Sequence, residues 1–241
     1  MPITRLIITP MQQLLFGITA GAMFVGTALY LWLFSKKQGG IALYIVPASI
    51  TVIAGIAYGV MSLSELGVVG DVVLEARYVD WVITTPLIVY SLATIAGTDT
   101  QTKGRAMAAD AVMIVLGYIS SVTTGAVKWA AFVASSAAFV LLLYYLVTAL
   151  TEAAGNRPPA VEAMFMGLRD LTVFLWLAFP LLWVVGPSGF ELIQATDHAY
   201  LLAFMDLTAK AGFNLIIALR TRAIQTTLGT EYLGDLSART A

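Results

Sequence analysis

The stretch LLAFMDLTAKAGFNLIIAL, residues 201–219, is an apolar segment about as long as the hydrocarbon core of a bilayer. It contains Asp206 and Lys210, whose i,i+4 spacing places both side chains on one face of a helix. An ammonium at bilayer depth costs roughly 3 kcal/mol on insertion scales, and it usually marks a functional site. Roughly 15 Å of helix separates Lys210 from Arg220, too far for the amine to reach the membrane interface. The segment therefore predicts a transmembrane helix with a buried, functional amine.

The composition of the whole chain predicts a membrane protein. The 241 residues are 59% hydrophobic and 11% charged, whereas soluble domains carry about 25% charged residues. We therefore predict a single all-α domain, residues 1–241, with seven transmembrane helices and a loose polar tail from about 223 to 241. Residues 157–170 are expected to start the sixth helix before it enters the membrane. The predicted spans are 11–35, 41–63, 76–97, 107–126, 130–151, 171–191 and 197–219.

The basic residues predict the orientation, because most of them fall on the side of the C-terminus. The rule that positive charges stay inside then places the N-terminus outside the cell and the C-terminus in the cytoplasm. We expect a multi-pass protein of the cell membrane, in contact with the lipid bilayer. The net charge of −1 gives no basic surface for nucleic acid. Without cysteine there are no disulfides or thiolate metal sites, and no metal is expected.

The third span contains a second set of buried polar residues in RYVDWVITTPL, residues 77–87. Arg77 and Asp80 share a helix face, and Thr84 follows one turn later, where its hydroxyl can donate to the Asp80 carboxylate. A desolvated lysine can form a Schiff base with an aldehyde, and the protonated adduct needs counterions. Asp80 and Asp206 can supply them. The alternative is a plain Arg77–Asp80 ion pair that only fixes the helix.

The sixth span, LTVFLWLAFPLLWVVG (residues 171–186), places Trp176, Phe179, Pro180 and Trp183 on one face. Such an aromatic face can bind a flat apolar ligand, or it can be ordinary packing, and the spacing alone does not decide between them. Asp110 is a further carboxylate at membrane depth, and we interpret it as a protonated, hydrogen-bonded packing residue.

Prolines within three of the predicted spans are expected to bend their helices. Pro47, Pro86 and Pro180 each remove one backbone hydrogen bond, so we expect a kink at each position.

Three stretches together resemble the microbial (type I) retinal rhodopsins. They are RYVDWVITTPL, MDLTAKAGF and the W-x-x-F-P-x-x-W pattern of the sixth span. The resemblance runs through nearly all seven spans, and it is greatest to haloarchaeal sensory rhodopsin II and the related middle rhodopsin. TTPLIVY, LLYYLVTALTEAAGNR and WVVGPSGFELI are further stretches that support it.

The resemblance implies a role for each matching residue. Lys210 is expected to bind retinal as a protonated Schiff base, with Asp80 as primary counterion and proton acceptor. Asp206 is implied as the second counterion, and Arg77 as the switchable partner of both. The positions that match the retinal pocket of the family are Trp81, Thr84, Thr85, Met113, Gly117, Phe132, Ser136, Phe139, Trp176, Phe179, Pro180 and Trp183.

Departures from the family pattern separate a sensor from a pump. Proton-pumping relatives have a carboxylic acid eleven residues after the primary counterion, where this chain has Ser91. Serine cannot supply a proton near neutral pH, so a slow photocycle is expected. Ser188 and His198 replace the outer glutamates of the pumps, and we interpret His198 as an exposed or capping residue.

The sequence thus predicts a light-activated photoreceptor that signals through a membrane partner, and not an enzyme. The alternatives are an outward proton pump of low turnover and a solute transporter that uses Lys210 and Asp206. Sensory rhodopsin II has hydroxyls where this chain has Ala209, Phe179 and Phe204. Their absence weakens the case for a conventional phototaxis transducer and favours the middle-rhodopsin relative. A homo-oligomer remains an open alternative.

Overall fold

The computed structural model describes residues 3–35 and 41–228, and all of its regular elements are helices. In these ranges seven helical stretches are long and apolar enough to cross a membrane, which confirms the predicted all-α, seven-span architecture. The elements are α1 (Ile3–Ser35), α2 (Ile41–Glu65), α3 (Val73–Ala96), α4 (Thr100–Val122), α5 (Gly125–Val147), α6 (Ala149–Ala154), α7 (Pro159–Val185), α8 (Ala195–Leu207), the π-helical η1 (Thr208–Gly212) and α9 (Phe213–Leu228).

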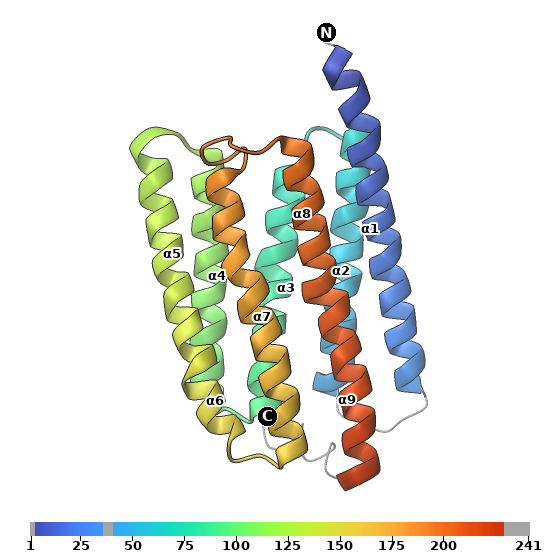
Figure 1. The fold of residues 1–241 in the computed structure, drawn as a ribbon, viewed down its shortest axis with the longest axis vertical. Helices are drawn as coiled ribbons and strands as arrows, with labels where there is room; N and C mark the ends of the chain where they lie inside the picture. Colours follow the sequence, from blue (N-terminus) through green and yellow to red (C-terminus); the bar gives the residue numbers. More distant parts are fainter. Residues whose placement is uncertain (1–2, 36–40, 229–241) are drawn as a thin grey trace.

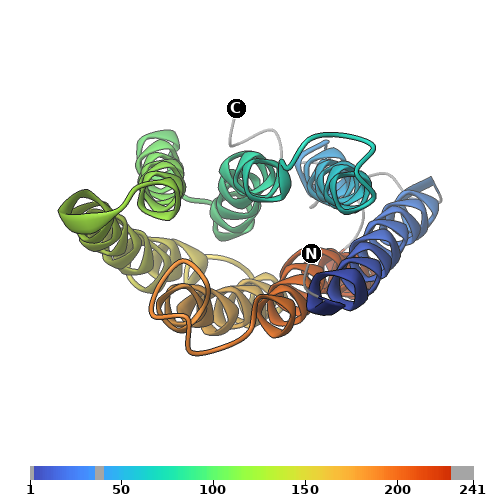
Figure 2. The same ribbon diagram turned by 90° about the horizontal axis from the view of Figure 1, so that it is seen from above.

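The helices run up and down in sequence order and form one bundle (Figure 1). From above, α2, α3 and α4 form one side of a flattened ring, and α5, α7, α8 and α1 form the other (Figure 2). We call the end where α1 begins the upper end, and the end where α9 stops the lower end. The connections at 97–99 and 155–158 lie at the lower end, and that at 186–194 lies at the upper end.

The fourth helix starts seven residues earlier than predicted, at Thr100 instead of 107. The polar run TDTQTKGR resembles a loop in composition, but Asp99 acts as an N-cap whose carboxylate accepts from the Thr102 backbone N–H at 2.9 Å. This hydrogen bonding from Thr102 also lowers the pKa of Asp99 below its usual value. The first turns of this helix are polar, so the hydrophobicity of the span placed its start too late.

The last two spans also differ from the prediction at their ends. α7 begins at Pro159, in agreement with the expected early start of the sixth helix, but it stops at Val185 and not at 191. Gly186 and Pro187 end it, because neither favours continuation of a helix. The last helix continues to Leu228, past 223 where a loose tail was expected. The rest of that predicted tail, 229–241, lies outside the described residues.

Gly97 ends α3 in a left-handed conformation, with φ of 74°. Arg157, from the α6–α7 connection, donates from Nε to the Ala96 carbonyl at 3.2 Å, and its guanidinium occupies the space where a Cβ of residue 97 would lie. Gly97 therefore allows this contact between the α6–α7 connection and the end of α3.

Replacing Gly97 by alanine is expected to destabilise the protein by about 1–3 kcal/mol, because alanine is strained at this φ and overlaps Arg157. Gly104→Ala is the matched control, since position 104 lies in α4 with open space around it. That control is expected to stabilise the helix by about 0.5–1 kcal/mol. Unfolding monitored by circular dichroism measures both, and equal stabilities of the two variants would contradict the role of Gly97.

Candidate functional site

Lys210 lies in the π-helical turn η1, in the middle of the last span. Its side chain is 1% exposed, and its amine forms a hydrogen-bonded ion pair with the Asp80 carboxylate. The amine is also 3.4 Å from Asp206 Oδ1. Single π-turns inside α-helices occur frequently at functional sites. The structure thus brings Asp80 of the third span together with Asp206 and Lys210 of the seventh in one buried cluster.

Asp80 is buried and is oriented from within its own helix. Thr84 lies one turn later and its hydroxyl donates to Asp80 Oδ1 at 3.2 Å and to the Asp80 backbone carbonyl at 2.8 Å. The Thr84–Asp80 hydrogen bond inferred from the sequence is therefore present. Neither residue lines the cavity described below, so both lie behind its wall, with Asp80 reached through Lys210.

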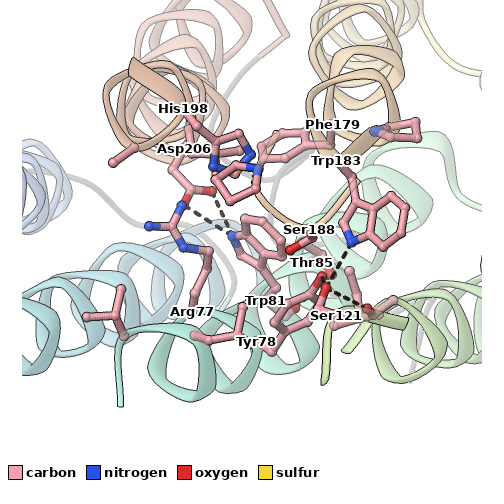
Figure 3. Close-up of a pocket in the computed structure, with 18 of the residues that line it drawn as sticks. Arg77, Tyr78, Trp81, Thr85, Ser121, Phe179, Trp183, Ser188, His198 and Asp206 are labelled. Atoms are coloured by element: carbon pink, nitrogen blue, oxygen red, sulfur yellow. Dashed lines mark hydrogen bonds between the residues drawn. The ribbon is translucent and has the colours of Figure 1, made fainter. Parts of the chain in front are cut away.

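Asp206 is held by two residues of other helices. The Tyr58 hydroxyl of α2 donates to Asp206 Oδ2 at 2.8 Å. The Trp81 indole nitrogen of α3 donates to the same carboxylate and lies 3.0 and 3.1 Å from its two oxygens (Figure 3). Tyr58 was not among the site residues predicted from the sequence. Its only signal is a single phenol in an apolar run of the second span, which does not reveal a partner 148 positions away.

Arg77 lies beside this cluster but pairs with neither aspartate. No ion pair within 4 Å in the described part of the chain includes it, so the alternative of an Arg77–Asp80 ion pair is not what the structure forms. Its Nη2 is 3.9 Å from the Met61 sulfur, and its guanidinium lies 5.9 Å from the Phe16 ring centroid. Its Nη1 is buried without a hydrogen-bond partner. The switchable role that the resemblance implies remains a prediction.

A cavity of about 560 Å³ extends from Lys210 between the helices. Aromatic side chains form much of its wall: Trp81 meets Phe179 edge to face at 5.2 Å between centroids, and Phe132 stacks on Trp183 at 4.5 Å. Pockets of this size lined by aromatic residues suit a flat apolar ligand. The residues predicted for the retinal site that line it are Arg77, Trp81, Thr85, Met113, Gly117, Phe132, Ser136, Phe139, Trp176, Phe179, Pro180, Trp183, Asp206 and Lys210.

The cavity wall also contains a hydrogen-bond network that the sequence did not suggest. Ser121 accepts from the Trp183 indole N–H at 2.8 Å and lies 2.8 Å from the Tyr78 hydroxyl (Figure 3). Thr85 donates to Asp110 Oδ2 at 2.7 Å, behind the wall. Asp110 is thus a buried, hydrogen-bonded residue of the packing around the cavity, as interpreted from the sequence, and its protonation stays a prediction.

Ser91 and His198, at two of the positions that distinguish pumps from sensors, lie in different parts of the bundle. Ser91 is buried in α3 and donates to the Leu87 carbonyl at 2.9 Å. His198 is neither an exposed residue nor the cap of α8, which is Gln194. It is half-buried in the cavity wall with its ring against Gly186, so that interpretation was wrong. The fold of the 186–189 turn onto α8 buries it, and sequence position alone could not show that.

The comparisons identify the family. The family model described as bacteriorhodopsin-like protein matches residues 10–224, and the chain belongs to this family. It is 39% identical over 215 residues to sensory rhodopsin III of Haloarcula marismortui, covering 88% of this chain and 92% of that one. It is 36% identical over 205 residues to sensory rhodopsin-2 of Natronomonas pharaonis, covering 84% and 86%. The fold matches thermophilic rhodopsin from Rubrobacter xylanophilus with a TM-score of 0.83 at 31% identity, over 94% and 99% of the chains.

The family implies retinal as cofactor, and the residues present fit it. The cavity offers a largely apolar, aromatic wall for a polyene, and a lysine amine in that wall for an aldehyde. Two carboxylates next to that amine balance the positive charge that a protonated imine carries. The chain is a multi-pass membrane protein with a retinal site between its helices.

Proposed function

We propose that this protein is a light-activated photoreceptor in which Lys210 binds retinal covalently. The observation that carries the proposal is the buried Lys210 amine, paired with Asp80 and Asp206 in the wall of an aromatic cavity. Retinal, when bound, supplies a polyene that light isomerises. The names of the relatives, sensory rhodopsin III and sensory rhodopsin-2, support a sensory role.

The hydrogen bonds support different roles for Asp80 and Asp206. Asp206 accepts from Tyr58 and Trp81, and these donors stabilise its charged form. Asp80 accepts one hydroxyl, that of Thr84, and is in direct contact with the Lys210 amine. We therefore assign Asp80 as the group that accepts the proton from the Lys210 nitrogen, and Asp206 as the counterion that stays charged.

Ser91 supports a sensor over an efficient pump. It is buried, its hydroxyl donates to the backbone of its own helix, and it cannot protonate the Lys210 nitrogen near neutral pH. The activated state then persists, which suits signalling. We place the upper end of the bundle outside the cell, following the distribution of basic residues, and propose a membrane-embedded transducer as the partner.

Flash photolysis of the retinal-reconstituted protein tests this assignment. We expect recovery of the dark state to be slow, and to accelerate when azide is added, because azide carries protons where an internal donor is lacking. A millisecond cycle that azide leaves unchanged would rule out the slow photoreceptor. A protein that stays colourless with all-trans retinal would instead support the solute transporter.

A light-driven outward proton pump of low turnover is the second candidate. One observation favours it: the cavity continues from Lys210 toward Glu65, Asp71 and His198 at the upper end, which offers protons a polar exit. It predicts light-driven acidification outside vesicles or cells that a protonophore abolishes.

A further inference from the structure

Lys103 is a second buried lysine, and none of the ion pairs in the described part of the chain includes it. It lies in the first turns of α4 at the lower end of the bundle and is 5% exposed. Its Nζ donates to the Thr94 hydroxyl at 3.2 Å and lies 4.8 Å from the centroid of the Tyr90 ring. Among the described residues no carboxylate lies within 4 Å of it. Buried lysines are rarely found without a charged partner, so Lys103 is a candidate functional residue.

Buried polar side chains lie between this lysine and the Lys210–Asp80 pair. In α3, Thr84, Ser91 and Thr94 are almost fully buried, and spacings of seven and three residues place them on one helix face. In α9, Asn214 and Thr221 are buried seven residues apart, also on one face. Both sets extend from the level of Lys210 toward the lower end.

Several oxygens in this half of the bundle have no hydrogen-bond partner. Within the described ranges these are Thr98 Oγ1, Asn214 Oδ1 and Thr221 Oγ1, all on residues at most 5% exposed. Buried polar atoms in proteins are nearly always hydrogen-bonded, and internal water is the usual partner where no side chain serves. These atoms therefore favour a hydrated route from the lower end toward Lys210.

The buried polar residues of this route are hydroxyls, an amide and one ammonium. None of them is an acid that could hold a proton; they are Ser91, Thr94, Thr98, Asn214 and Thr221, with Lys103 as the ammonium. A proton that enters from the lower end then passes close to the Lys103 ammonium, with which it has the same charge. Charge repulsion in a buried site is much stronger than in water.

We propose that the Lys103 ammonium is an electrostatic gate that slows the return of protons from the lower end to Lys210. The inference rests on the proposed photoreceptor function. Thr94 and Tyr90 hold the ammonium in place. Ser91 is not an acid, so the chain has no internal proton donor at this position. Lys103 slows the entry of protons from the lower end. Both features lengthen the life of the activated state.

Lys103→Met keeps most of the length of the side chain and removes its charge. We expect its dark-state recovery after a flash to be about tenfold faster than that of the unmodified protein. Lys103→Arg keeps the charge and is expected to recover slowly. Arg105→Gln is the control, because it also removes one positive charge. Arg105 lies two residues further along the same helix, and its side chain is exposed. Unchanged recovery in Lys103→Met overturns the gate, and slower recovery would make Lys103 a proton donor instead.

A second measurement needs neither light nor retinal. ¹⁵N-lysine NMR of the retinal-free protein at pH 7, with the Lys103 signal assigned by its loss in Lys103→Arg, reports whether the amine is charged. The gate requires an ammonium, and a neutral amine would overturn it even if Lys103→Met failed to fold. If the protein binds no retinal, the proposed function fails. If it forms a pigment that cycles alike with and without the Lys103 charge, only the gate fails.

Discussion

Lys210→Ala purified with retinal is expected to remain colourless, with complete loss of the visible absorption band. The alanine has no amine to bind an aldehyde, and it leaves Asp80 and Asp206 as two buried carboxylates without their cation. Absorption spectra of the purified protein measure the effect.

The control for this experiment is Lys103→Met, which removes the charge of another buried lysine. It is expected to keep the visible band, because Lys103 lies at the lower end of the bundle and does not line the cavity. A Lys210→Ala protein with an unchanged, covalently bound pigment would show that retinal is attached elsewhere.

Asp80→Asn is expected to move the visible band to longer wavelength and to abolish light-induced deprotonation of the Lys210 nitrogen. The Asp80 carboxylate stabilises the positive charge of the ground state, and a charge pair at 4 Å is worth about 4 kcal/mol at an effective dielectric constant of 20. A change of that size in the excitation energy corresponds to a shift on the order of tens of nanometres. The asparagine also cannot accept a proton.

The matched control is Asp110→Asn, which makes the same chemical change at another buried carboxylate. Asp110 is hydrogen-bonded to Thr85 and forms no ion pair with Lys210, so its replacement is expected to leave deprotonation intact. An Asp80→Asn protein with the original spectrum and normal deprotonation would remove Asp80 from the role of counterion.

The transmembrane architecture could be predicted because the spanning length and the cost of buried charge constrain the sequence directly. The 206–210 spacing and the 80–84 spacing are local, so the Asp206–Lys210 and Asp80–Thr84 neighbours follow from helix periodicity alone. The aromatic face of the sixth span pointed toward a ligand only through the family resemblance, since packing produces the same spacing.

Other parts of the site depend on contacts between distant segments and could not be predicted. Tyr58 and Ser121 gain their roles from partners on other helices. The π-turn at Lys210 contains no proline that would indicate a break in the regular helix. His198 is half-buried because a turn packs Gly186 against its ring. Helix ends such as that before Thr100 are polar, so hydrophobicity misplaces them.

Borohydride reduction of the retinal-bound protein under illumination, followed by peptide mass spectrometry, tests most directly where the chromophore is attached. The predicted result is a retinyl group on the peptide that contains Lys210, and on no other lysine peptide. Recovery of that peptide without the added mass, or a retinyl group on a different lysine, would contradict the account.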